Sequence, residues 1–158
     1  MKVTLAGVAL VGLLVTCPAP AHSQYECEMD SRECSPPSPS GALGYAALWF
    51  PDSPYDDTSF GFQLCYGILE GTPIGAEIRR AGQNGEEVLY TLIEGEFPSY
   101  YVEVFNGWDP ADASDLDEQI LSIVIMTTAY PSGEVCGSIY RHMPVLKTTW
   151  GHVRTLFR

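Results

Sequence analysis

The chain has 158 residues, a formal net charge of −12 at pH 7 and 46% hydrophobic residues. This length provides one domain with one core, and the hydrophobic content excludes a disordered acidic chain. The negative charge repels nucleic acid and anionic membranes, so neither is an expected partner. All acidic residues lie between Glu26 and Glu134.

Residues 1–23 have the pattern of a secretory signal peptide. One positive charge is followed by an apolar run over residues 3–15, and we place cleavage after Ser23, with Ala21 as the alternative. The run is too short for a hydrocarbon core about 30 Å thick, so we expect no integral membrane span. The sequence around Cys17 is similar to a lipoprotein box, which leaves lipid anchoring as an alternative. We otherwise expect a secreted, extracellular protein.

Residues 24–40 predict a polar lead-in to the folded domain. The segment is rich in proline and serine and ends in SPPSPS, a composition that excludes a helix. It contains two cysteines, Cys27 and Cys34, and we expect it to contribute little to the core.

Four cysteines remain after cleavage, namely Cys27, Cys34, Cys65 and Cys136. An even number in an exported chain indicates two disulfides, with three possible pairings. Cys27 and Cys34 lie seven residues apart in a polar segment. We therefore favour a local pair between them and a second pair of Cys65 with Cys136. A metal site is the rival interpretation, but the sequence places no histidine beside these cysteines and has no CxxC pair.

From residue 41 to residue 140 the sequence predicts a β-domain. Short alternating or apolar runs predict strands at 41–50, 60–69, 75–81, 87–93, 100–105, 120–128 and 134–140. The pair Asn84-Gly85 predicts a tight hairpin, because both central residues of that turn need positive φ. This spacing, with at most one short helix, predicts an all-β fold, either an antiparallel β-sandwich or a barrel-like domain.

Acidic side chains cluster between two of the predicted strands, at Asp109, Asp112, Asp115, Asp117 and Glu118. Their spacing lacks the fixed alternate ligands and the central glycine of an EF-hand calcium loop. Carboxylates ahead of Leu116 suit the first turn of a short helix, where they meet the positive end of the helix dipole. We therefore predict a solvated helix start rather than a calcium site.

No constellation in the sequence points to catalysis. His142 and His152 lie ten residues apart, and no cysteine or carboxylate close in sequence completes a metal site. The hydrolase motif GxSxG and glycine-rich phosphate loops are also missing from the sequence. We predict a protein that is not an enzyme, with no catalytic residues, no metal ligands and no cofactor.

A basic, aromatic tail over residues 141–158 ends the chain. Its candidate partner-binding residues are Arg141, Lys147, Trp150, Arg154 and Arg158. The tail has no acid, so it is suited either to a separate anionic partner or to the acidic body of its own chain. A surface ion pair contributes only about 0–1 kcal/mol, whereas burying one large apolar side chain contributes about 1.5–3 kcal/mol. We therefore predict that the tail docks on the body through its apolar side chains.

Three stretches of the chain share the pattern of one family. They are Pro36-Pro37 followed by Gly41-Ala42-Leu43, then Ala76-Glu77-Ile78-Arg79-Arg80 with Gly82-Gln83-Asn84-Gly85, and LSIVIMTTAYPSGEVCGSI at residues 121–139. With these stretches, residues 36–140 resemble the CHRD domain, the module named for chordin and found in many exported bacterial proteins. The motif positions are Glu77, Arg79, Asn84, Gly85, Met126, Pro131, Gly133, Glu134 and Gly137.

The chain departs from the family pattern at four of its positions. Glu77 and Arg79 stand where the pattern has two histidines, Met126 stands where it has a third, and Cys136 replaces an arginine. A carboxylate and a thioether are a poor mixed ligand set for one ion. The comparison with the family therefore implies a structural patch, with a Cys65–Cys136 disulfide in place of polar contacts.

The resemblance implies an exported, non-catalytic β-domain that acts as a protein- or matrix-binding module. The expected partner is an extracellular protein or an anionic matrix or envelope polymer. Two alternatives stay open, namely a structural envelope or coat component and a metal-dependent redox enzyme of dismutase-like architecture. The loss of the three family-pattern histidines argues against the enzyme.

Overall fold

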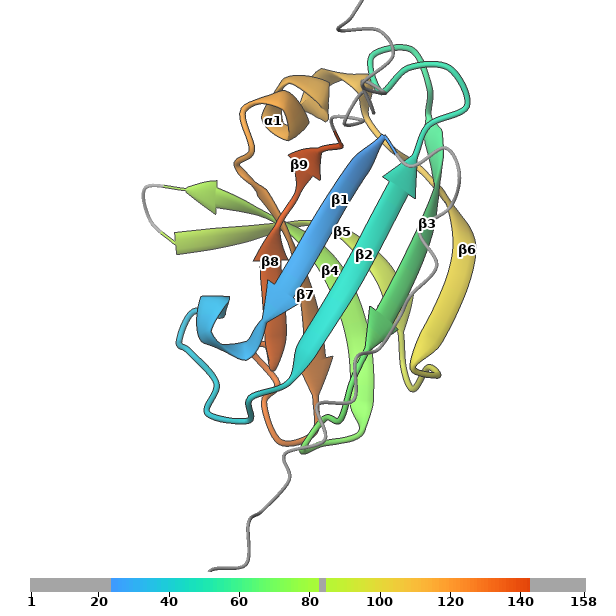
Figure 1. Ribbon diagram of the computed structural model, residues 1–158. Coiled ribbons are helices and arrows are strands. Elements are labelled where there is room, and N and C mark those ends of the chain that lie inside the picture. Colours follow the sequence, from blue (N-terminus) through green and yellow to red (C-terminus); the bar gives the residue numbers. More distant parts are fainter. Residues whose placement is uncertain (1–23, 83–84, 143–158) are drawn as a thin grey trace, which may run out of the picture.

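Antiparallel strands build almost the whole domain. The computed structural model describes residues 24–82 and 85–142. Its strands are β1 (Tyr25–Asp30), β2 (Leu43–Trp49), β3 (Ser59–Tyr66), β4 (Pro73–Gly82), β5 (Gly85–Glu94), β6 (Tyr100–Asn106), β7 (Leu121–Thr127), β8 (Val135–Ser138) and β9 (Tyr140–Arg141). They form one sheet that curves into a nearly closed barrel (Figure 1). The all-β, barrel-like prediction is confirmed.

The strand order explains how the sheet closes. It runs β5-β4-β7-β8-β1-β2-β3-β6, and β9 pairs with the start of β1. The two ends of this path, β5 and β6, meet through side chains, since the rings of Tyr90 and Phe105 lie 5.5 Å apart. The barrel is therefore closed at this seam by packing, and β6 has β3 as its hydrogen-bonded neighbour in the sheet.

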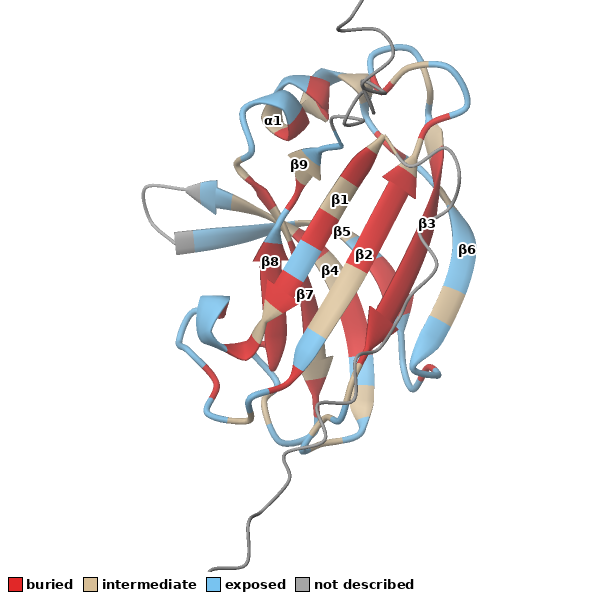
Figure 2. Ribbon diagram, viewed as in Figure 1, coloured by how far each residue is buried: buried red, intermediate tan, exposed pale blue. Residues whose placement is uncertain are grey.

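Alternating side chains give the sheet its buried face. On β3 the residues Phe60, Phe62 and Leu64 point inward and are fully buried, and they pack with β-branched and aromatic side chains of the other strands. Figure 2 shows this burial concentrated on the central strands. Trp108 joins the aromatic cluster and its indole N–H donates to the Pro54 carbonyl at 2.8 Å, which satisfies its polar atom inside the core.

One short helix lies near one end of the barrel. The 3₁₀ turn η2 (Pro110–Asp112) leads into α1 (Ala113–Asp117), as the acidic cluster predicted. The Asp109 carboxylate accepts from the backbone N–H of Ala111 at 2.9 Å and so caps the turn. Leu116 is fully buried against the core, which fixes the helix to the sheet.

The prediction of a lead-in outside the core is wrong for its first half. Residues Tyr25–Asp30 form β1, which pairs along its full length with β2 inside the sheet. Tyr25, Cys27 and Met29 are buried, while the acids between them face outward. The sequence YECEMD alternates with the period of a strand, but its three acidic residues make the segment look like a polar linker. The 3₁₀ turn η1 (Ser31–Glu33) follows.

The favoured disulfide pairing is also wrong. Cys34 is bonded to Cys136, with 5.0 Å between their Cα atoms, and Cys27 is a buried free thiol. Cys65 also forms a disulfide, but its partner is not Cys136, because Cys136 is bonded to Cys34. The reason is the direction of β1: its pleat turns Cys27 into the core, where the thiol donates to the Gly137 carbonyl at 3.1 Å. Cys34 lies beyond η1 in a separate cluster beside Val124.

Candidate functional site

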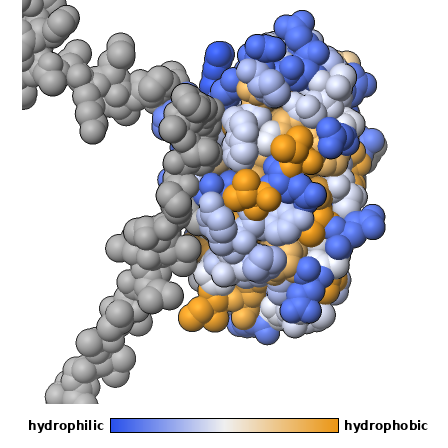
Figure 3. Space-filling model, turned by 90° about the vertical axis from the view of Figure 1, so that its right-hand side faces the viewer, coloured by the Kyte–Doolittle hydropathy of each residue, from blue (hydrophilic) through white to orange (hydrophobic). Residues whose placement is uncertain are grey.

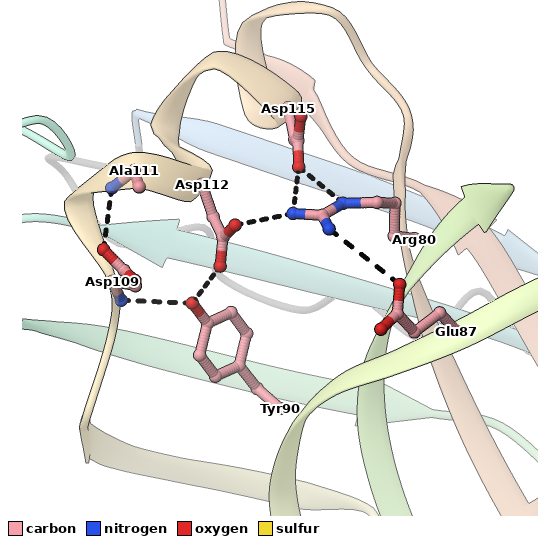
Figure 4. A network of polar contacts seen from close by, with 7 residues as sticks. All are labelled: Arg80, Glu87, Tyr90, Asp109, Ala111, Asp112 and Asp115. Carbon is pink, nitrogen blue, oxygen red and sulfur yellow. Dashed lines mark hydrogen bonds and ion pairs between the residues drawn. The ribbon is translucent and has the colours of Figure 1, made fainter.

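The acidic cluster around α1 is organised by one arginine. Arg80, on β4, donates from Nε to the Asp115 carboxylate at 2.6 Å and from a terminal nitrogen to Asp112 at 2.5 Å (Figure 4). Glu87 on β5 lies 3.9 Å from the same guanidinium. The guanidinium therefore neutralises the charge of the helix carboxylates and ties the helix turn to the sheet.

Tyr90 extends this network from β5. Its hydroxyl donates to the second oxygen of Asp112 and accepts from the backbone N–H of Asp109 at 3.1 Å. Burial, reinforced by the hydrogen bond to Asp112, raises the pKa of Tyr90 to about 12. Asp117 accepts from the hydroxyls of Tyr25 and Tyr55 at 3.1 and 2.7 Å.

Most of the cluster makes contacts within the fold. Asp109 caps a turn, Asp112 and Asp115 pair with Arg80, and Asp117 holds two tyrosines. The prediction of a helix start is confirmed. The prediction that its acids are only solvated holds for Glu118, which is exposed, whereas the other four carboxylates form hydrogen bonds or ion pairs within the protein. In the described part of the chain, no group of three histidine, cysteine or acidic residues is arranged to hold a metal.

Three of the family-motif positions do come together on neighbouring strands. Glu77 and Arg79 of β4 form an ion pair of 2.8 Å, and Arg79 also contacts Glu86 at 3.3 Å and the Ser132 carbonyl at 2.9 Å. Met126 of β7 lies opposite Gly75, one pleat from Glu77, and packs on the cluster that contains the Cys34–Cys136 disulfide. In this patch the cation and the carboxylate are therefore already paired with each other.

The last family motif, at residues 121–139, contains the turn before β8 and the close contact of β8 with β1. Pro131 is exposed, and Gly133 has a φ of +141°, which disfavours any side chain. At Gly137, an added Cβ would lie 2.1 Å from the carbonyl oxygen of Glu28 on β1. Gly137 therefore allows β8 to lie close to the backbone of β1, and Gly133 allows the positive φ of the turn. Gly85 starts β5 opposite Gly82, and Asn84 lies outside the described residues.

Glu134 is fully buried and anchors a neighbouring loop. Its carboxylate accepts from the backbone N–H groups of Glu70 and Gly71, at 2.6 and 3.4 Å, and from the Thr127 hydroxyl at 2.7 Å. Three donors compensate for the loss of water around the carboxylate. Ile68, which is 83% exposed, belongs to the loop that this carboxylate fixes in place.

An exposed apolar strip runs along the edge strand β6. Tyr100, Val102 and Val104 alternate on its outer face and are 51%, 48% and 57% exposed. We call these three residues the β6 strip. Figure 3 looks onto this side of the molecule and shows hydrophobic side chains standing among hydrophilic ones. A row of exposed apolar side chains on one strand is a feature of interaction sites, because monomeric proteins rarely leave adjoining apolar side chains in contact with water.

Acidic side chains lie on β1, three strands away from β6 on the outer side of the same sheet. Glu26 and Glu28 point outward from β1, opposite Ala47 and Tyr45 of β2. Burial and the neighbouring Glu26 raise the pKa of Tyr45 well above its ordinary value. Between these acids and the β6 strip, the outward-facing residues Ala47 of β2 and Gln63 and Cys65 of β3 are buried.

The sequence-predicted tail lies almost entirely outside the described residues. Arg141 ends β9, whereas Lys147, Trp150, Arg154 and Arg158 are not among the residues that the structure describes. The β6 strip was not among the predicted site residues. Its sequence, YYVEVF, predicts a strand, but only the sheet order shows that the strand lies at an edge.

Comparisons with family models, with curated proteins and with solved structures find no match for this chain. The resemblance to the CHRD domain therefore stays a prediction. Across residues 24–82 and 85–142, the structure has no helix long and apolar enough to span a membrane.

Proposed function

We propose that this protein is an exported, non-catalytic binding module and that the β6 strip is its binding site. The observation that carries the proposal is the combination of an edge strand with three exposed apolar side chains on one face. Support for a non-catalytic role comes from the polar networks, because the carboxylates of Asp112, Asp115 and Glu134 are all engaged in holding the fold together.

The partner best suited to this site is an extended segment of another protein. An extended segment that lies on the outer face of β6 would cover these three side chains with apolar contact, since the edge of β6 beside β5 is already closed by side-chain packing. The body of the domain is acidic, so a segment with basic residues beside its apolar ones matches the surface. An extracellular protein fits these needs better than an anionic polymer, which the acidic body would repel.

The proposal can be tested with a photo-crosslinking amino acid at position 102 of the exported protein. We expect a heterologous protein to be captured at this position, and capture to fail when Val104 is replaced by Lys. The matched control is a crosslinker at Val88, another exposed valine, which lies on β5. Equal capture from both positions would contradict a site on β6. Capture of only further copies of this chain would favour the structural envelope or coat component instead.

A further inference from the structure

Gln24, which directly precedes β1, joins three segments of the sheet. Its backbone N–H donates to the Leu48 carbonyl at 3.0 Å, and its own carbonyl accepts from the backbone N–H of His142 at 2.8 Å. Its side-chain amide pairs with the backbone of Phe50 in both directions. Nε2 donates to the Phe50 carbonyl at 3.2 Å, and Oε1 accepts from the Phe50 N–H at 3.1 Å. Gln24 therefore connects the start of β1 with the end of β2 and with the residue after β9.

The predicted end of the signal peptide gives these contacts a chemical consequence. Cleavage after Ser23 makes Gln24 the N-terminal residue of the mature chain. An N-terminal glutamine can cyclise: its α-amine attacks the side-chain carbon Cδ, a C–N bond forms, and the amide nitrogen leaves as ammonia. The product, pyroglutamate, has neither a free α-amine nor the Nε2 donor. Cyclisation would therefore remove one positive charge from the chain and the amide that pairs with Phe50.

The contacts of Gln24 oppose this reaction. Ring closure requires Cδ to approach the α-nitrogen to within about 3–3.5 Å in the correct orientation. In the structure, the α-nitrogen is held by the Leu48 carbonyl and the side-chain amide is held by Phe50. Phe50 cannot follow the amide, because its ring is buried against Phe60 and Trp108. Cyclisation therefore requires both hydrogen bonds to Phe50 to break, which is a local opening at the start of β1.

We propose that Gln24 is the N-terminal residue of the mature protein and a cyclisation site that the fold protects. The folded chain keeps a free α-amine beside the Leu48 carbonyl, and pyroglutamate forms only when the start of β1 opens. The inference rests on the export of the chain, which is one part of the proposed function, and does not involve the β6 strip.

The test follows the N-terminal peptide of the exported protein by mass spectrometry, after production in a host without glutaminyl cyclase. We expect this peptide to begin at Gln24 and to keep its α-amine during long incubation of the folded protein at neutral pH. The matched variant inserts one alanine after Gln24. The insertion moves the N-terminal glutamine by one residue, so its side chain changes face and loses its place opposite Phe50. This variant should lose ammonia at least about tenfold faster, because no hydrogen bond to Phe50 has to open first.

Three results would overturn the protection of Gln24. They are an N-terminal peptide that begins at another residue, pyroglutamate already present in the freshly exported wild-type protein, and equal rates of ammonia loss in the wild type and the insertion variant. Circular dichroism shows whether the variant keeps the fold. If it does not, the comparison is made between the wild type in buffer and the wild type unfolded in guanidinium chloride, where an equal rate has the same meaning. A wild type that cyclises while it still captures a partner at position 102 would leave the proposed function intact.

Discussion

The Cys34–Cys136 disulfide provides the most direct test of the fold. It joins residues 102 positions apart in sequence, between the segment after β1 and strand β8. For a loop of this size, the chain-entropy model gives about 4.7 kcal/mol of stabilisation, and measured values are commonly about 2–4 kcal/mol. We therefore expect C34A/C136A to lower the free energy of unfolding by about 3–5 kcal/mol.

Urea unfolding, followed by tryptophan fluorescence, measures this loss. With a denaturant slope of about 2 kcal/mol/M, a loss of about 4 kcal/mol moves the midpoint down by about 2 M. The control is C27A, which removes one sulfur from the core without opening a loop and should cost about 1 kcal/mol. A double variant that unfolds at the wild-type midpoint would refute the reasoning. So would a non-reducing peptide map that joins Cys27 to Cys34.

Three further predictions follow from other contacts. Burial raises the pKa of the Cys27 thiol well above its usual range, so maleimide at pH 8 should modify Cys27 only after denaturation, as peptide mass spectrometry can show. R80L leaves Asp112 and Asp115 without their cation and should cost about 2 kcal/mol of unfolding free energy, whereas R32L, at an exposed pair, should cost less than about 0.5 kcal/mol. Burial, together with hydrogen bonds to Asp117 and Asp112, raises the pKa of Tyr25 and Tyr90 to about 12 from 10.0. Because the folded pKa is the higher one, their stabilisation is complete below about pH 10 and is lost as the pH rises toward about 12, so the melting temperature should fall across that interval.

The strands were predictable because their signals are local. The hairpin of β4 and β5, the strand β7 and the turn before β8 all occupy the segments that alternation and turn residues indicated. β1 was missed because three of its six residues are acidic, and only pairing with β2 on one side and with β8 and β9 on the other makes such a segment part of a core.

The cysteine pairing depended on distances that no local pattern contains. Cys27 and Cys34 are close in sequence, but an extended strand carries the chain about 3.3 Å per residue away from its start. The pleat then sends Cys27 inward. The β6 strip could not be recognised for the same reason, since an edge position is a property of the sheet order.

The arrangement of charge restricts what can bind to this domain. Three of its arginines, Arg32, Arg79 and Arg80, are paired with carboxylates of the domain itself. The pair of Arg79 with Glu86 ties β4 to β5, and the pair of Arg80 with Asp115 ties β4 to the helix turn, so these cations neutralise acids that the fold brings close together. The other acids determine the field outside the protein, which is negative. A partner for the proposed site on the β6 strip would therefore gain affinity from cations beside its apolar side chains.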